Sequence, residues 1–196
     1  MPDTEIMLAR HGETEWSRDL RHTGHTDIPL TDIGREQARA LATRFSDLEL
    51  AFVLTSPLSR ATESCRLAGL GDQAVEEPDL VEWDYGEYEG MTTEEIRRDV
   101  PGWTVWDGGA PGGEDANQVG ARADRVIARV READGPGVVF AHGHVLRVLG
   151  ARWIGLPAAS GALLALSTST LSTLGYERDR QVLTLWNDGG HLQPGA

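Results

Sequence analysis

The chain has 196 residues, of which 40% are hydrophobic and 25% charged, and its formal net charge at pH 7 is −13. This length fits one domain with a full hydrophobic core, so we expect residues 1–196 to form a single domain. The negative charge argues against nucleic acid and anionic membranes as partners, because both repel an acidic surface.

The marks of secreted, membrane and zinc-binding proteins are missing from the sequence. The first ten residues lack a basic n-region, and no apolar run is long enough to span a bilayer. Cys65 is the only cysteine, so the chain needs no oxidising compartment. We therefore expect a cytoplasmic location and no metal site, with Cys65 as a small buried apolar residue in a helix.

The N-terminal half alternates apolar runs with helical patterns. Residues 6–9 predict a buried strand that opens into a loop at Arg10 and His11. A helix should then begin near Pro29, with one apolar face made of Ile33, Ala38, Leu41, Ala42 and Phe45.

A second strand is predicted over residues 51–54. It stops at Ser56 and Pro57, which suit the N-cap and the first turn of a helix that carries Arg60. A strand, a tight loop and a helix, repeated twice, indicate a layered α/β domain.

Residues 78–115 differ in composition from the rest. They combine prolines and glycines with five aromatic residues, Trp83, Tyr85, Tyr88, Trp103 and Trp106. A flexible linker would not carry so many aromatic side chains, so we interpret this segment as an excursion from the domain rather than a linker. Thr92 and Glu95 predict a capping box at the start of a short helix.

The C-terminal part predicts a long helix, a strand, another helix and a hairpin. Asp115 and Gln118 form a second capping box, and the buried stripe that follows is Val119, Ala123, Val126, Ile127 and Val130. Residues 137–141 read as a third buried strand that ends at His142 and leads directly into a helix. Residues 170–176 and 181–186 are typical of a β-hairpin.

Three predicted strands end in basic or titratable side chains: Arg10 with His11, then Arg60, then His142. Ligand sites in open α/β sheets form outside the carboxyl ends of the strands, so these side chains should converge. Taken singly, each is more often a surface arginine or a loop histidine. Together they predict a locally basic pocket on an acidic chain, which suits a phosphorylated ligand because arginine forks match phosphate oxygens.

Five segments resemble, in order, motifs of the histidine phosphatase superfamily, phosphoglycerate mutase branch. These segments are Arg10–Thr14, Gly24–Gly34, Ser56–Ser64, Glu82–Gly90 and Ala141–His144. The resemblance covers about residues 5 to 155. It implies a three-layer α/β/α sandwich with a mostly parallel central sheet, and no metal or organic cofactor.

The resemblance also implies roles for individual residues. His11 would be the nucleophile that becomes phosphohistidine, and Glu82 the acid for the leaving group and then the base for water. Arg10, Arg60 and His142 would hold the phosphoryl oxygens, and Thr23 and Gly24 match positions near the substrate. The 78–115 excursion would form the wall or lid of the substrate site.

The proposed chemistry is reasonable without the family name. An imidazole can divide one difficult displacement into two easier ones, and fixed positive charge stabilises a transferring phosphoryl group. Glu82 could otherwise be a surface carboxylate in an acidic segment.

Many family members carry Asn where this chain has Ser17, so whether Ser17 contacts phosphate stays open. Trp16 could line the pocket or simply pack against the protein.

Three functions are open at this point. We expect a phosphatase acting on small phosphorylated metabolites such as sugar phosphates, resembling sedoheptulose-1,7-bisphosphatase-type and broad-specificity acid phosphatases. A phosphoglycerate mutase is the alternative, although such enzymes usually carry an added segment that closes the site against water. A non-catalytic phosphate-binding domain is the third, but all the residues of the motifs that carry chemistry are present. The exposed helix faces are compatible with a homodimer.

Overall fold

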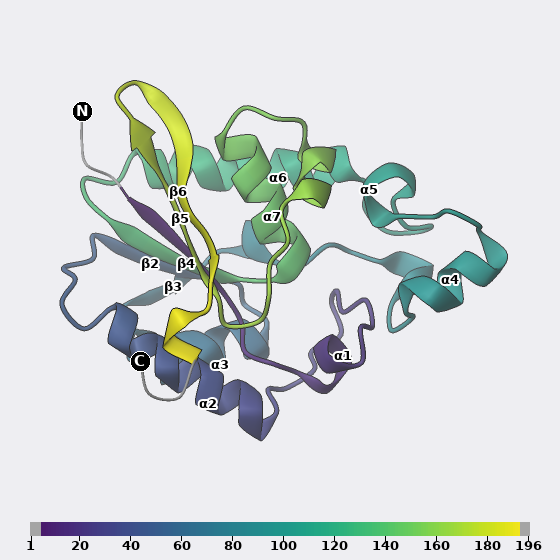
Figure 1. Cartoon of the computed structure of the whole chain (residues 1–196), viewed down its shortest axis with the longest axis horizontal. Helices are drawn as coiled ribbons and strands as arrows, with labels where there is room; N and C mark the ends of the chain where they lie inside the picture. Colours follow the sequence, from purple (N-terminus) through teal and green to yellow (C-terminus); the bar gives the residue numbers. More distant parts are fainter. Residues whose placement is uncertain (1–4, 193–196) are drawn as a thin grey trace.

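Six strands form one mixed sheet in the order β3-β2-β4-β1-β5-β6 in the computed structural model, which describes residues 5–192 (Figure 1). The strands are β1 (Ile6–Arg10), β2 (Phe52–Thr55), β3 (Ala74–Glu76), β4 (Gly137–Ala141), β5 (Leu171–Glu177) and β6 (Arg180–Asp188). β1 to β4 run parallel to one another, β5 is antiparallel to β1, and β6 is antiparallel to β5. The expected mostly parallel central sheet is confirmed.

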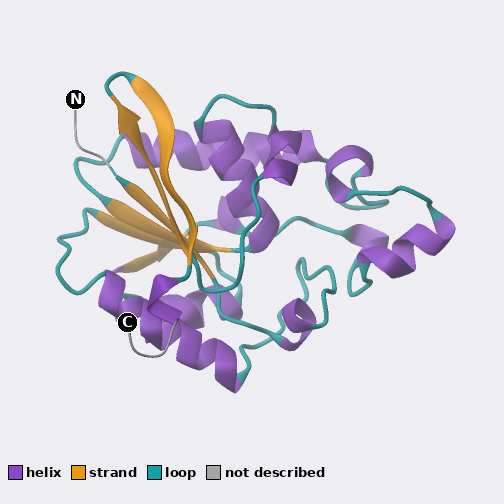
Figure 2. Ribbon diagram, in the orientation of Figure 1, coloured by secondary structure: helices purple, strands orange, loops and turns teal. Residues whose placement is uncertain are grey.

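Alternating side chains of the central strands supply two separate hydrophobic cores. Ile6 and Leu8 of β1 belong to one core, whereas Met7 and Ala9 belong to the other. Helices α6 (Ala116–Arg131) and α7 (Gly143–Trp153) cover the first face, and α2 (Asp32–Ala40) and α3 (Ser59–Leu67) cover the second (Figure 2). The sandwich is therefore three-layered, as the sequence predicts, because a strand buried on both faces needs helices on both sides.

The predicted capping boxes form at both expected helix starts. Thr92 and Glu95 cap α4 (Thr93–Asp99), and Asp115 and Gln118 cap α6. The predicted stripe of α6 is buried. The short helices are α1 (Glu15–Arg18) and α5 (Val105–Gly108), with 3₁₀ turns at Leu41–Arg44, Gly71–Gln73, Pro78–Leu80, Gly86–Tyr88, Ala158–Leu163 and Gly190–Leu192.

Two local expectations are wrong. Ile33 is 56% exposed, because α2 presents Gly34 and Ala38 to the core and turns Ile33 outward. The third helix begins at Ser59 with Leu58 as an N-cap that makes no side-chain bond. Ser56 lies two residues before that N-cap: its hydroxyl is 2.7 Å from Nε2 of His142 and accepts only a long bond, 3.4 Å, from the Leu58 N–H.

The 78–115 segment leaves the sheet on the side where the parallel strands end, with α4 and α5 at its outer side (Figure 1). Trp83, Tyr85 and Trp103 are buried in it, as expected of a packed excursion rather than a linker. Cys65 is buried in α3, and burial raises the pKa of its thiol to about 12. Within residues 5–192, no helix combines the length and apolar character that crossing a bilayer requires.

Shortening the same side chain at the centre and at the edge of the sheet should separate their contributions to stability. Val139 of β4 is fully buried and Val75 of β3 is 51% exposed. We expect Val139→Ala to lower the free energy of unfolding by about 2–3 kcal/mol through lost burial and a residual cavity. The matched Val75→Ala should cost less than about 0.5 kcal/mol. Urea unfolding measures both, and equal losses would contradict the assignment of β4 as the central strand.

Candidate active site

The ends of three neighbouring parallel strands bring the predicted side chains together. Arg10 lies beside Ala141 in the β1–β4 pairing, so His11 and His142 follow at the same edge of the sheet. Their ring centroids are 5.1 Å apart, and both rings are buried. Arg60 reaches the same place from α3. The convergence expected from the sequence is therefore present.

His11 is held as one tautomer. Its Nδ1 lies 2.7 Å from the carbonyl oxygen of Gly12, and because a carbonyl can only accept, Nδ1 carries the hydrogen. Nε2 then keeps a free lone pair. Burial, followed by the positive charges of Arg60 and Arg10, holds the pKa of His11 well below its ordinary value, so the ring is neutral and can act as a nucleophile.

A close backbone contact fixes the loop that carries His11. A Cβ atom on Gly12 would lie 2.2 Å from the oxygen of Gly34, and one on Gly34 would lie 2.1 Å from the oxygen of Glu13. The Gly12 N–H also donates to the Ser64 hydroxyl at 3.0 Å. The loop after β1 can therefore rest directly on α2 and α3 only because glycine occupies both positions.

Arg10 keeps hydrogen-bonding capacity for a ligand. Its Nη1 donates to the Leu166 carbonyl at 2.5 Å, and its Nε is buried without a hydrogen-bond partner among the described residues. The guanidinium lies against the backbone of Gly143, where an added Cβ would be 3.3 Å from Cζ. A buried N–H without a partner is costly, so an anionic oxygen is a natural partner for it.

Arg60 is fully buried and its N–H groups are engaged by the protein. It donates to the backbone oxygens of Thr23, Gly24 and Thr26 at 2.8–3.2 Å, and its Nε donates to Nδ1 of His142 at 3.1 Å. Since Nδ1 accepts, Nε2 of His142 carries the hydrogen and donates to Ser56. Burial, followed by the Arg60 charge, lowers the pKa of His142 strongly, so its ring is neutral.

Glu82 is buried rather than on the surface. Its Oε1 accepts from the backbone N–H groups of Trp83 and Val145, and its Oε2 accepts from that of His144, each at 2.9 Å. His144 and Val145 lie in the first turn of α7, whose free N–H groups stabilise an acidic side chain. Within residues 5–192, Oε2 accepts from one N–H group, so one of its lone pairs stays available to a ligand.

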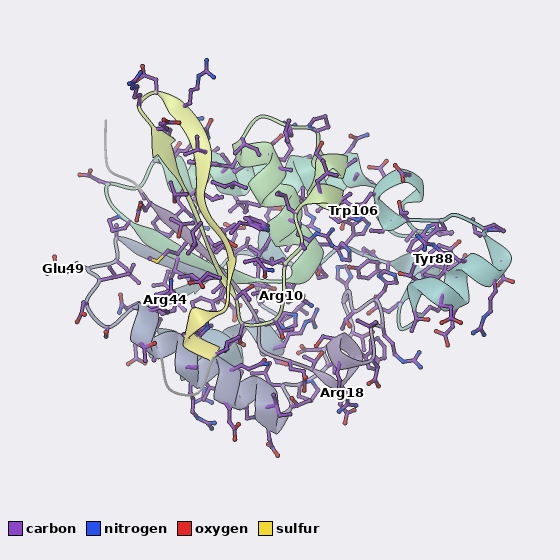
Figure 3. All side chains as sticks on the ribbon, in the orientation of Figure 1. Arg10, Arg18, Arg44, Glu49, Tyr88 and Trp106 are labelled. Atoms are coloured by element: carbon purple, nitrogen blue, oxygen red, sulfur yellow. The ribbon has the colours of Figure 1, made fainter. Side chains whose placement is uncertain are left out.

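The site opens onto a cavity of about 760 Å³ between the strand ends and the 78–115 segment. Arg10, His11, Thr23 and Glu82 line it, whereas Arg60 and His142 lie behind its wall. Gly24 also lies outside the lining, and its N–H donates to Glu89. Figure 3 shows Arg10 near the middle of the molecule, and Tyr88 and Trp106, both in the 78–115 segment, to its right.

The cavity is more basic than the chain as a whole. Four arginines line it, Arg10, Arg21, Arg97 and Arg147, against the three acidic residues Asp19, Glu82 and Glu94. The whole chain, by contrast, carries a net charge of −13. Among residues 5–192, no three His, Cys, Asp or Glu side chains gather as a metal-binding group. The positive side chains that line the cavity are the guanidinium groups of these four arginines.

A sequence profile of the histidine phosphatase superfamily (branch 1) matches residues 6–189. The chain belongs to this family.

The curated relatives carry several names. The chain is 42% identical to an acid phosphatase of Mycobacterium tuberculosis, over 96% of this chain and 95% of that protein. It is 36% identical to a sedoheptulose 1,7-bisphosphatase of Saccharomyces cerevisiae, over 76% of this chain and 67% of that protein. It is also 29% identical to a "Probable phosphoglycerate mutase GpmB" of Enterobacter sp., over 93% of this chain and 89% of that protein.

A solved structure supports the same fold. The protein of open reading frame Rv3214 from Mycobacterium tuberculosis superposes with a TM-score of 0.90 at 39% sequence identity, covering 94% of this chain and 97% of that one. The three-layer fold expected from the family's motifs is thereby confirmed.

Two residues of this family member acquire a place that the sequence did not predict: Arg147 lines the cavity, and Ser56 orients His142. Tyr85, from the predicted wall segment, and His144, next to the site by sequence, line the cavity as well. The position of His144, two residues after His142 at a helix start, was the available signal for it. Ser17 also lines the cavity, but its hydroxyl donates to the Thr14 oxygen in the cap of α1. Trp16 lies outside the lining and sits against Gly90.

Acid should destabilise the protein through its buried histidines. Burial lowers the pKa of His11, His142 and His144 strongly, and that of His22 to about 4. The unfolded chain binds protons below about pH 6.5 while the folded one resists them, so the free energy of unfolding should fall as the pH falls from about 6.5 toward 4. The slope is at most about 1.4 kcal/mol per pH unit for each histidine.

Urea unfolding at pH 7.5, 6.5 and 5.5 tests this expectation. The His22→Phe variant should show a shallower loss than the wild type, since one of the four groups is removed. Stability that stays constant from pH 7.5 to 5.5 would contradict the neutral, buried state of these rings.

Proposed function

We propose that this chain is a metal-independent phosphomonoesterase that transfers a phosphoryl group to Nε2 of His11 and then to water. The observation that carries the proposal is the state of His11. Its ring is buried and neutral, and its Nδ1–H donates to the Gly12 oxygen. His11 also lines the same cavity as Arg10 and Glu82. A neutral imidazole with one free nitrogen is a competent nucleophile.

The first step forms the covalent intermediate. The Nε2 lone pair attacks phosphorus, a P–N bond forms, and the P–O bond to the leaving alcohol breaks. Glu82 Oε2 donates its proton to the departing oxygen, which an alkoxide leaving group requires. The free Nε of Arg10 is placed to hold a phosphoryl oxygen, and Arg60 adds fixed positive charge behind the rings.

The second step returns the enzyme to its starting state. Glu82, now a carboxylate, takes a proton from a water molecule, and the water oxygen attacks phosphorus. The P–N bond breaks, inorganic phosphate leaves, and His11 recovers its neutral ring. In this scheme His142 supports the site by hydrogen bonding with Arg60 and Ser56. Thr23 lines the wall nearest the substrate, and Gly24 supports that wall from behind through its bonds to Arg60 and Glu89.

The names of the relatives support hydrolysis of small phosphorylated metabolites, with sugar phosphates as the expected class. Two of them are called phosphatases, an acid phosphatase and a sedoheptulose 1,7-bisphosphatase. A cavity of about 760 Å³ is larger than a phosphate group needs and falls in the size range of small-molecule sites. The relative named as a probable mutase makes transfer to a second hydroxyl the competing outcome.

Trapping the intermediate tests the nucleophile. Acid-labile phosphate should appear on the wild type incubated with a ³²P-labelled substrate and quenched in alkali, and not on His11→Asn, whose turnover should fall at least about 10³-fold. His25→Ala, which alters an exposed histidine outside the cavity lining, is the matched control. Label that persists in His11→Asn would overturn the mechanism. Conversion of 3-phosphoglycerate to its isomer without phosphate release would favour the mutase.

Replacing Glu82 should affect substrates according to their leaving groups. We expect Glu82→Gln to lower kcat/KM for an alkyl phosphate by about 10²–10⁴-fold, because it removes proton donation to a poor leaving group. The leaving phenol of an aryl phosphate is acidic and needs little protonation. The loss of kcat/KM for such a substrate should therefore be smaller by at least about tenfold. The comparison of glycerol 3-phosphate with 4-nitrophenyl phosphate measures this ratio. Equal losses would mean that Glu82 is structural.

A further inference from the structure

A buried tyrosine and a histidine beside the proposed acid form a hydrogen-bonded pair that the mechanism above does not use. The Tyr85 hydroxyl lies 2.5 Å from Nδ1 of His144, and Tyr85 is 1% exposed. Both side chains line the cavity. Tyr85 comes from the 78–115 segment and His144 from the first turn of α7, so the pair joins the two sides of the site.

The hydrogen-bond count defines the tautomer of His144. Within residues 5–192 the Tyr85 hydroxyl has one partner, Nδ1 of His144. A buried hydroxyl hydrogen needs an acceptor, so the tyrosine donates and Nδ1 accepts. The hydrogen of the neutral ring therefore resides on Nε2. Burial lowers the pKa of His144 strongly and raises that of Tyr85, which agrees with a neutral O–H···N pair rather than an ion pair.

Nε2 of His144 is open to the cavity. This nitrogen makes no hydrogen bond in the described part of the chain, and it is not fully buried, so a ligand in the cavity can reach it. Aromatic neighbours hold the ring on several sides, with ring centroids 5.1 Å away at Trp106, 6.0 Å at His22 and 6.1 Å at Trp83. The N–H is thus oriented before any ligand arrives.

The position of this donor relative to Glu82 indicates which part of a substrate it meets. The backbone N–H of His144 holds Glu82 Oε2, the oxygen that we expect to protonate the leaving group. The phosphoryl side of the cavity is occupied by His11 and Arg10. The aromatic neighbours of the His144 ring are His22 and, from the 78–115 segment, Trp83 and Trp106. The ring therefore lies on the side of the cavity nearer this segment, where we expect the part of the substrate that departs as the alcohol.

We propose that His144 is a specificity-determining residue whose Nε2–H donates a hydrogen bond to an oxygen of the alcohol part of the substrate, and that Tyr85 is the positioning residue that keeps this N–H directed into the cavity. The inference rests on the proposed phosphatase function and names its substrate class. Esters with a free hydroxyl near the phosphate-bearing carbon, that is, polyol phosphates, should be preferred to esters whose leaving group has no acceptor.

Nuclear magnetic resonance of ¹⁵N-labelled histidine tests the donor without turnover. At pH 7, the wild type should show His144 as the single Nε2–H tautomer, assigned with His144→Gln. The phosphonate analogue of glycerol 3-phosphate, in which CH₂ replaces the ester oxygen, should shift the Nε2 signal, and phenylphosphonate should not. An Nδ1–H tautomer, or equal shifts with both compounds, would overturn the proposal.

Kinetics test the substrate preference with variants of matched shape. His144→Phe keeps an aromatic ring without a donor, and we expect about a threefold to tenfold lower kcat/KM for glycerol 3-phosphate, the value of one hydrogen bond, with phenyl phosphate changed less than about twofold. His144→Gln restores an N–H and should recover most of the loss. Tyr85→Phe should also lower kcat/KM for glycerol 3-phosphate, and it should leave kcat/KM for phenyl phosphate unchanged.

The outcomes separate the two proposals. Equal losses for both substrates in His144→Phe, or no loss for either, would overturn the role of His144 while leaving the phosphatase intact. A wild type that hydrolyses neither ester would overturn the proposed function, and the resonance experiment would still decide whether Nε2–H meets the polyol part of a ligand.

Discussion

The buried guanidinium of Arg60 is the interaction on which the site depends. It extends from α3 and donates to backbone oxygens of the 23–26 loop and to the ring that follows β4. Three segments that are distant in sequence are therefore joined at one charged group. Removing it would leave several buried acceptors without donors, which is among the more costly changes that a folded protein can undergo.

The same charge sets the protonation of the neighbouring imidazoles. Arg60 lies beside His142 and near His11, and it adds to burial in lowering the pKa of both rings. A neutral His11 is what nucleophilic attack requires. The acidic surface and the arginine-lined cavity thus serve different purposes: the first sets the behaviour of the whole protein in solution, and the second decides what can enter the site.

Much of the fold could be predicted from the sequence because its determinants are local. Apolar runs marked the central strands, and the boxes at Thr92 and Asp115 marked two helix starts. Parallel strands bring their ends to one edge, so Arg10, His11 and His142 could be grouped without coordinates. The resemblance to family motifs then added Glu82 to this group. In the structure the Glu82 carboxylate accepts hydrogen bonds at the N-terminus of α7.

The remaining features depend on contacts that the sequence does not encode locally. Ser56 has the sequence signature of a helix cap, but a ring 86 residues away competes for its hydroxyl. Ile33 fits a helical stripe, but its exposure is decided by which face of α2 meets the sheet. The pairing of Tyr85 with His144 spans 59 residues and depends on how the 78–115 segment folds back onto α7.

The contact between Gly12 and Gly34 has a consequence for the energetics of the reaction. Backbone atoms meet there with no room for a methyl group, so the loop that carries His11 has little freedom to move when a ligand binds. The entropy of placing the nucleophile is lost when the chain folds and is not lost again in each catalytic cycle. The site is in this sense preorganised: folding itself fixes the geometry of attack, and the cost of that order falls on the stability of the protein rather than on the barrier to phosphoryl transfer.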